Sequence, residues 1–455
     1  MREALERLAG PGSVTEAPVE DLWPRHLLRA RSGQGPPSVL SVRPSTYEGV
    51  QAVVRWALET RTVIVPAGGL SGVCGAIELG AGQVALDLRG LDRILELDEP
   101  NLTCTVQAGI LGSALESVLE GRGLTLGHFP SSLPVATVGG LVSTRSSGQM
   151  STYYGNIEDL LLGVTAVLPD GTLLDRHRPG PRSAIGPALH QLFVGAEGGL
   201  GIVLDATLRI SRRPESTIGR GYRFETLGEG LAVMRLTLQS GLRPLVMRLY
   251  DPEDTQFQGQ ELGGGCLLVV AAAGPEPTAR AAMEVVASQC RAARDLGPAP
   301  WERWLDHRYG LSAERLREVM EAPGMIADTI ELAAPWTEVE ALHGEVKAVL
   351  GGGQRLALCH FSHASAQGCC AYFTFAGRCS GEAEAETVYR EVWEAAMEAA
   401  LRRRATLSHH HGAGQSRAPW IRAELGGWAD TWELVRRAFD PGRLMNPNAV
   451  GGGRG

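Results

Sequence analysis

Three glycine-rich segments, each beside a short apolar strand, set the strongest constraint on how this chain can fold. They read PAGGLSG at residues 66–72, TVGG at residues 137–140 and GAEGGLG at residues 195–201. Glycine lacks a Cβ atom, so such segments let the backbone turn sharply or approach another group closely. None of them matches G-x-G-x-x-G or G-x-x-x-x-G-K-[ST], which argues against a Rossmann fold or a P-loop. Tight structural loops and an anion-binding site are both compatible with the first segment taken alone.

Small hydroxyl side chains are concentrated around the second glycine segment, between residues 128 and 163. Glycines and hydroxyls together allow close approach and hydrogen bonding to a flat cofactor with polar edges. A loop of this length without a function is uncommon. These hydroxyls belong to Ser131, Ser132, Thr137, Ser143, Thr144, Ser146 and Ser147.

Short apolar strands alternate with amphipathic helices along the chain, which predicts an α+β protein. Residues 1–35 are predicted to form a helix-rich lead, and a β-α-β unit follows from residue 38. The strand that begins at Gly201 closes the first half, and we expect a boundary near Arg213-Pro214. A last helix is predicted to stop at Asp440-Pro441.

Composition excludes several classes of protein. The net charge is −8, which disfavours a general nucleic-acid binder. We expect no signal peptide, and the sequence has no apolar run long enough for a membrane span. None of the 8 cysteines forms a C-x-x-C pair, so we expect reduced thiols, no bound metal and a cytoplasmic location. A homodimer and peripheral contact with a membrane are compatible with this interpretation.

In their order and spacing, the three glycine segments resemble the flavin-binding domain of the vanillyl-alcohol-oxidase superfamily, which has the p-cresol-methylhydroxylase fold. The closing FDPGRLMNP resembles the superfamily's C-terminal return to that domain. The resemblance implies an FAD-binding domain of two α+β subdomains over residues 36–213. It also implies an α+β substrate or cap domain with an antiparallel sheet over residues 214–424, and a return to the FAD domain over residues 425–455.

Within this superfamily, TVGGLVSTRSSGQMSTYYGNIEDLLLG and GPRSAIGPALHQLFVGAEGGLGIV are similar to the alkyldihydroxyacetonephosphate synthase family. VMRLYDPEDTQF, CCAYFTF and LSHHHGAG resemble that family's segments with a functional arginine, a catalytic tyrosine and an active-site histidine triplet. The resemblance implies catalytic roles for Tyr372, His409, His410 and His411. It implies substrate contacts for Arg248, Arg317 and Asn446.

The same resemblance implies FAD held without a covalent bond, because no histidine or cysteine stands where it would bond to the flavin. Leu70 replaces a glycine that is usual in the family, and we expect its side chain to lie where the pyrophosphate would bind. The implied cofactor-binding residues are Pro66, Ala67, Gly68, Gly69, Leu70, Ser71, Gly72, Ser131, Ser132, Leu133, Pro134, Val135, Ala136, Thr137, Gly139, Gly140, Thr144, Arg145, Ser146, Ser147, Glu197, Gly198, Gly199, Leu200, Gly201, Ile202 and Val203.

Two activities are consistent with these residues. The first is a flavin-dependent transferase that exchanges the acyl chain of acyl-dihydroxyacetone phosphate for a fatty alcohol, forming the ether bond of ether lipids. In that reading an arginine binds the phosphate, and the tyrosine and histidines move a proton next to the ketone. The alternative is an FAD-linked oxidoreductase of a 2-hydroxy acid such as glycolate or D-lactate. Without the resemblance, Tyr372 could be a core residue and the histidines a solvated run.

Overall fold

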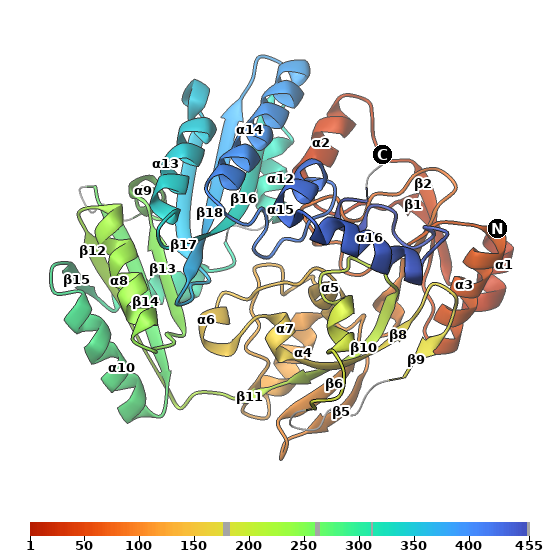
Figure 1. The fold of residues 1–455 in the computed structure, drawn as a ribbon, viewed down its shortest axis with the longest axis horizontal. Coiled ribbons are helices and arrows are strands. Elements are labelled where there is room, and N and C mark those ends of the chain that lie inside the picture. The colour runs from red at the N-terminus through yellow and green to blue at the C-terminus, as the bar shows by residue number, and fades with distance from the viewer. Residues whose placement is uncertain (176–182, 260–263, 311–312, 453–455) are drawn as a thin grey trace. The chain divides into compact units, whose positions relative to one another are not determined.

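The computed structural model describes residues 1–175, 183–259, 264–310 and 313–452, and the chain divides into two compact units (Figure 1). The first unit contains Met1–Ser146, Asn156–Arg212 and His410–Gly455. The second contains Ser147–Gly155 and Arg213–His409. The chain enters the second unit for its long segment at Arg213 and returns to the first unit at His410.

The first unit contains a four-stranded sheet of order β1-β2-β4-β3. Strands β2 and β3 both run parallel to β4, and the helix between them, α3, begins at a Thr46 cap whose Oγ1 accepts a hydrogen bond from Gly49 N at 3.0 Å. This confirms the predicted β-α-β unit. The N-terminal residues 1–35 are less helical than predicted. Strand β1 lies between the first two helices and pairs with β2, which follows the second helix. The elements are α1 (Arg2–Ala9), β1 (Val14–Pro18), α2 (Pro24–Arg31), β2 (Ser38–Val42), α3 (Tyr47–Thr60), β3 (Ile64–Ala67) and β4 (Val84–Asp87).

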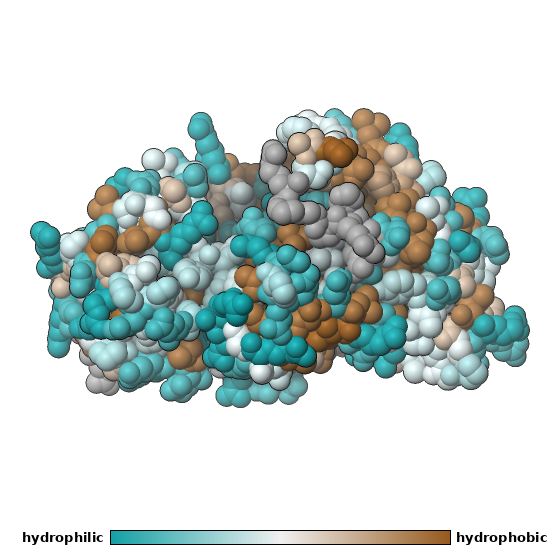
Figure 2. All heavy atoms as spheres, turned by 90° about the horizontal axis from the view of Figure 1, so that it is seen from below, coloured by the Kyte–Doolittle hydropathy of each residue, from teal (hydrophilic) through white to brown (hydrophobic). Residues whose placement is uncertain are grey.

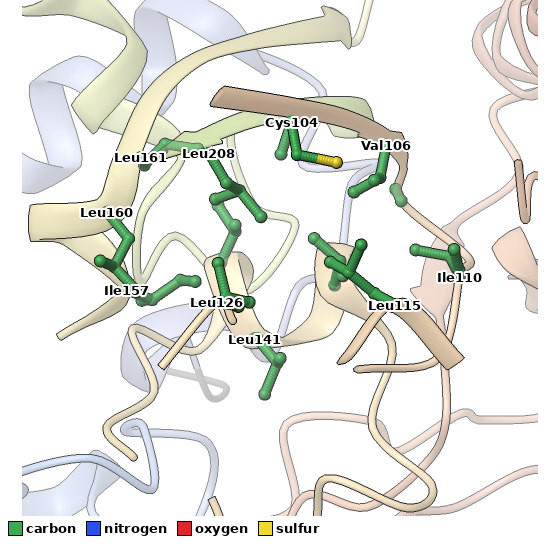
Figure 3. Packing of buried hydrophobic residues seen from close by; sticks show 14 of the residues in the cluster. Cys104, Val106, Ile110, Leu115, Leu126, Leu141, Ile157, Leu160, Leu161 and Leu208 are labelled. Atoms are coloured by element: carbon green, nitrogen blue, oxygen red, sulfur yellow. The ribbon is translucent and has the colours of Figure 1, made fainter. Parts of the chain in front are cut away.

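A five-stranded antiparallel sheet of order β5-β6-β10-β8-β9 forms the second layer of this unit. Its apolar face packs on α4 and α5, and Figure 3 shows Val106, Leu115, Leu141 and Leu208 among the side chains between sheet and helices. Helix α5 carries the second glycine segment, so this core fixes that segment in place. The elements are β5 (Ile94–Asp98), β6 (Thr103–Gln107), α4 (Gly112–Glu120), β7 (Leu124–Thr125), α5 (Val138–Ser143), α7 (Ile157–Leu160), β8 (Leu161–Val167), β9 (Leu173–Leu174), β10 (Ile202–Arg209), β11 (Ser211–Arg212), α15 (Ile421–Leu425) and α16 (Trp428–Phe439).

The second unit is built on a seven-stranded sheet of order β15-β12-β14-β13-β17-β18-β16. Every pair in it is antiparallel, as predicted for the substrate domain. Helix α13 packs on β16, β17 and β18, while α8 and α10 pack on the strands at the other end. The strands are β12 (Ser216–Phe224), β13 (Val246–Tyr250), β14 (Cys266–Gly274), β15 (Arg294–Gly297), β16 (Met325–Pro335), β17 (Leu356–Ser362) and β18 (Gly368–Arg378). The helices are α6 (Ser151–Tyr154), α8 (Leu227–Gln239), α9 (Pro252–Phe257), α10 (Glu276–Gln289), α11 (Ala299–His307), α12 (Ala313–Met320), α13 (Val339–Leu350) and α14 (Glu382–Arg402).

Polar residues cover much of the face shown in Figure 2, and hydrophobic residues gather there in separate patches. No helix in the described part of the chain combines the length and the apolar character that crossing a membrane requires.

Helix α14 is attached to the sheet through a buried carboxylate. Asp328 Oδ2 accepts hydrogen bonds from Tyr389 Oη at 2.6 Å and from Trp393 Nε1 at 3.1 Å. All three residues are at least 95% buried, so removing the acceptor leaves two donors without it. We expect Asp328→Ala to lower the free energy of unfolding by about 2–5 kcal/mol. Tyr389→Phe removes one donor only and should cost clearly less; equal losses in denaturant titrations would contradict this account.

Candidate active site

The first two glycine segments pack directly against each other in the first unit. A Cβ atom on Gly69 would lie 1.8 Å from the carbonyl oxygen of Val135, and one on Gly68 would lie 2.2 Å from Oγ1 of Thr137. Real Cβ atoms do not approach so closely. Glycine at these positions is therefore required by contact between the two segments, not only by approach to a ligand.

The third segment joins the other two. A Cβ atom on Gly198 would lie 2.3 Å from Cγ of Pro66, which belongs to the first segment. Glu197 N donates a hydrogen bond to the carbonyl oxygen of Ser143, which ends α5, at 2.9 Å. The three segments that the sequence predicts to share a site thus meet in the first unit.

Two of the three segments carry a non-glycine residue in the left-handed region. The φ angles are 55° at Leu70 in the first segment and 49° at Glu197 in the third. Arg145, which follows the second segment and the end of α5, has a φ of 54°. Such conformations cost free energy in residues with a Cβ atom and gather at functional sites, so they support the assignment of a site here.

The Leu70 side chain contacts the core of the first unit. It packs, partly buried, against the apolar cluster that includes Val39, Val65 and Leu79, and its backbone is left-handed, with a φ of 55°. The expectation that this side chain lies where the pyrophosphate would bind stays a prediction.

The loop around Leu70 fits an anionic cofactor. The backbone N–H groups of Gly69, Leu70, Ser71 and Gly72 donate no hydrogen bond to any residue that the structure describes. A run of backbone donors around a left-handed residue forms an anion-binding nest. In the second segment, a Cβ atom on Gly140 would lie 3.2 Å from Oγ1 of Thr137, and no other described atom outside its adjacent residues and the backbone of its own helix would lie within 4 Å, so there is open space next to Gly140. These features fit the pyrophosphate of FAD.

Two predicted site residues have structural partners of their own. Asn446 is 1% exposed, and its Nδ2 donates to the carbonyl oxygens of Ala76 at 3.1 Å and Glu197 at 2.6 Å. Ser147, predicted to contact the cofactor, belongs to the second unit, where its hydroxyl lies 3.0 Å from Nδ1 of His363. The roles predicted for these residues in binding stay predictions.

In the second unit, the antiparallel register places polar side chains in one row across four strands. Tyr250 on β13 is paired with His360 on β17, His360 with Tyr372 on β18, and Tyr372 with Glu331 on β16. Directly paired residues point to the same face of a sheet, and so do residues two apart on one strand. Arg248 therefore shares this face as well. We call this face, with Arg248, Tyr250, His360, Tyr372 and Glu331, the candidate substrate face. It brings together two predicted site residues, Arg248 and Tyr372, from segments far apart in the sequence.

Arg248 has a free hydrogen-bond donor on this face. Its Nε is buried and has no partner among the residues that the structure describes. Its Cζ lies 5.3 Å from the centre of the Tyr250 ring, within range of a cation–π contact. A buried guanidinium N–H without an acceptor is costly, and a bound anion would supply that acceptor.

Tyr372 stacks on His360, with ring centres 4.8 Å apart and planes 17° apart. Burial raises the pKa of Tyr372, and the nearby carboxylates of Glu331 and Asp328 raise it further, while Arg248 acts in the opposite sense. Burial lowers the pKa of His360 to about 4, with a contribution from Arg248. Both groups are therefore neutral at pH 7, and the phenol holds its proton. Burial therefore outweighs the effect of the neighbouring Arg248 on the pKa of Tyr372.

The histidine triplet spans the boundary between the units. His409 belongs to the second unit, where its ring centre is 5.0 Å from that of His363. His410 and His411 belong to the first, with ring centres 4.6 Å apart. Arg317, the other predicted substrate residue, lies on α12, which packs against β16.

The sequence analysis missed Glu331, His360 and Asp254. Glu331 is fully buried beside Tyr372, and the Asp254 carboxylate lies 3.5 Å from Nδ1 of His360. The sequence signal was a polar residue at an alternate position of an apolar strand, as in IELAAP and LALCHFS.

Two models of known families match the chain. The FAD binding domain matches residues 39–176, and the C-terminal domain of FAD linked oxidases matches residues 213–450. The second match alone covers more than half of the chain.

Individual relatives agree with these matches. The alkyldihydroxyacetonephosphate synthase of Dictyostelium discoideum is 30% identical over 94% of this chain and 75% of its own length. The uncharacterized FAD-linked oxidoreductase YgcU of Escherichia coli O157:H7 is 31% identical over 90% of this chain and 88% of its own length.

Solved structures show the same fold. An alkyldihydroxyacetonephosphate synthase structure superposes with a TM-score of 0.83 at 26% identity, covering 98% of this chain and 85% of that one. For p-cresol methylhydroxylase the TM-score is 0.77 at 15% identity, over 99% of this chain and 96% of that one, which supports the fold alone. The chain is therefore an FAD-dependent enzyme of the vanillyl-alcohol-oxidase superfamily and belongs to the same family as the alkyldihydroxyacetonephosphate synthases.

Proposed function

We propose that this enzyme exchanges the acyl group of acyl-dihydroxyacetone phosphate for a fatty alcohol and so forms an ether bond. The observation that carries the proposal is the buried, unsatisfied Nε of Arg248 on the face that also presents Tyr372. A substrate with a phosphate and an acidic C–H next to its ketone needs both an anion-binding donor and a proton-transfer group. The similarity to alkyldihydroxyacetonephosphate synthases supports this substrate class.

FAD would be held by the backbone donors of residues 69–72, by the open space at Gly140 and by the segment from Glu197 to Val203. When bound, the flavin supplies an electrophilic centre for a carbon nucleophile. Arg248 would bind the substrate phosphate, and the planar guanidinium can donate two parallel hydrogen bonds to it.

Tyr372 would act next to the ketone as a neutral phenol, because burial raises its pKa. A neutral phenol can donate a hydrogen bond to the negative charge that develops on the ketone oxygen, so the proton on the adjacent carbon needs a separate acceptor. The histidines are the proposed acceptors, because neutral imidazole can take up a proton. The bond between that carbon and the ester oxygen then breaks, the alcohol oxygen bonds to the carbon, and the hydroxyl proton of the alcohol is released with the fatty acid.

The alternative is oxidation of a 2-hydroxy acid. It is favoured by the similarity to YgcU and to the glycolate oxidase subunit GlcD of Bacillus subtilis, which is 25% identical over 99% of this chain. In this reading Arg248 would bind a carboxylate. The cytoplasmic location, the homodimer and the membrane contact belong to the proposal in either case.

Incubation of the purified yellow enzyme with each substrate class separates the two functions. Acyl-dihydroxyacetone phosphate and a long-chain alcohol should give free fatty acid and ether product with no net flavin reduction. Bleaching of the flavin by D-lactate or glycolate, without ether product, would establish the oxidoreductase instead.

A side chain at residue 140 should prevent flavin binding without unfolding the protein. Gly140→Val places a branched side chain in the open space beside Thr137 and should remove the yellow cofactor while the protein stays folded. Gly69→Val clashes with the Val135 carbonyl and should also lower the melting temperature. Absorbance at 450 nm and thermal unfolding measure the two effects; stoichiometric flavin in Gly140→Val would place the cofactor elsewhere.

Tyr372 and His409 should act in one proton-transfer step. Tyr372→Phe and His409→Ala should each lower kcat by about 10²-fold. The double variant should lose far less than the product of the two, because residues that act as a unit are not additive. Strict additivity in steady-state kinetics would argue that they serve separate steps.

Arg248 should control affinity for the anionic end of the substrate. Arg248→Lys keeps the charge but loses the planar fork, so KM should rise by the equivalent of about 1–3 kcal/mol, with flavin content unchanged. Arg220→Lys is the matched control, because Arg220 lies on β12 and pairs with Asp295 at 2.8 Å on the surface. Full activity of Arg248→Ala on acyl-dihydroxyacetone phosphate would exclude the proposed phosphate contact.

A further inference from the structure

We propose that two buried glutamates, Glu331 and Glu197, are positioning residues that fix the two ends of the histidine triplet. Each belongs to a different unit and binds the part of the triplet segment that lies in its own unit. The inference deepens the proposed function and rests on it, because it assumes that the histidines take part in the reaction.

Glu331 holds the beginning of the segment. It is fully buried on β16, and its Oε1 accepts a hydrogen bond from Ser408 Oγ at 2.9 Å. Its Oε2 accepts one from His409 N at 2.6 Å. Glu331 is also the cross-strand neighbour of Tyr372 on β18. Its carboxylate therefore links the backbone of His409 to the part of the sheet that carries Tyr372.

Glu197 holds the end of the segment. Its carboxylate is 5% exposed and accepts hydrogen bonds from Ala413 N at 2.8 Å and from Gly414 N at 3.0 Å. Val450 N donates to its Oε2 at 2.7 Å. A Cβ atom on Gly412 would lie 2.7 Å from Oε1, so the turn after the triplet closes tightly over this carboxylate.

The backbone of Glu197 is itself fixed to the cofactor loops. Its N donates to the Ser143 carbonyl, and its carbonyl accepts from Asn446 Nδ2. Burial raises the pKa of Glu197, and the three backbone N–H groups oppose that shift. Within the first unit, the residue therefore sets the position of His410 and His411 relative to the cofactor segments.

The donors differ between the two glutamates, and this difference makes the proposal testable. At Glu331, one donor is a hydroxyl, which can turn to accept a hydrogen bond instead. Glutamine at residue 331 can therefore accept from His409 N with its oxygen and donate to Ser408 with its amide. At Glu197, both oxygens accept hydrogen bonds from backbone N–H groups, which cannot act as acceptors. Glutamine at residue 197 must place an NH₂ group against one of them.

The experiment compares Glu331→Gln, Glu331→Leu and Glu197→Gln in the full-length holoenzyme. Flavin content, melting temperature and kcat are measured for each variant, alone and combined with His410→Ala or His409→Ala. Asp440→Asn is the matched control, because Asp440 is also buried and accepts from the backbone N–H groups of Leu444 at 3.0 Å and Met445 at 2.8 Å. Both of these donors lie outside the segment of residues 408–414 that contains the triplet.

We expect Glu331→Gln to keep most of the turnover, and Glu331→Leu and Glu197→Gln to lose at least about 10-fold in kcat with flavin retained. The Glu197→Gln loss should shrink to less than about 2-fold in the His410→Ala background, and the Glu331→Leu loss should shrink likewise with His409→Ala. Asp440→Asn should lower the melting temperature, and any loss of kcat that it causes should be the same with and without His410→Ala.

The proposal would be overturned if Glu331→Gln and Glu197→Gln lowered kcat equally. It would also be overturned if the losses of kcat persisted unchanged in the His409→Ala and His410→Ala backgrounds. Either result would leave the glutamates a general role in stability. Loss of flavin in Glu197→Gln would overturn it for Glu197 and make that residue part of the cofactor site. If the histidine variants themselves keep full turnover, the histidine role in the proposed function has failed, which is a separate result.

Discussion

The close contact between backbone segments in the first unit is the constraint on which the rest of the site depends. The carbonyl of Val135 occupies the position that a side chain on Gly69 would need, and Pro66 does the same for Gly198. Because glycines stand at these contacts, the three loops can pack closely, and the backbone N–H groups of residues 69–72 stay without an acceptor among the described residues. A substitution that separates the loops by the width of a methyl group would lose both the packing and the array of donors.

Much of the architecture could be predicted from the sequence because its signals are local. The β-α-β unit, the paired strands β17 and β18 and the long helix α14 follow from apolar periodicity and from turn residues. The meeting of the three glycine segments was confirmed as well. The direction of the Leu70 side chain was not predictable, since it depends on a left-handed φ that an isolated leucine does not adopt. A resemblance marks that position as unusual, but only the backbone shows that the side chain points into the core.

Only some residues of the candidate substrate face could be predicted from the sequence. Arg248 and Tyr372 lie in segments with a recognisable pattern, whereas Glu331 and His360 gain their significance from pairing with Tyr372. Strand register over such separations is fixed by the whole sheet and cannot be read from a single strand. The same holds for the pKa of Tyr372. The sequence alone identifies it only as a phenol, whereas in the sheet it is a buried phenol near the carboxylates of Glu331 and Asp328, which raise its pKa.

The first unit is discontinuous, and this has a consequence for how the protein forms during synthesis. The N–H of Ile64 on β3 donates to the carbonyl of Leu444, the Ile64 carbonyl accepts from the N–H of Asn446, and Val450 N binds Glu197. Chains emerge from the ribosome with their N-terminus first. The nascent first unit therefore lacks partners for one edge of β3 and for part of the Glu197 carboxylate until residues 444–450 have been translated. The second unit, apart from residues 147–155, is one continuous stretch and can fold while the ribosome still holds the end of the chain.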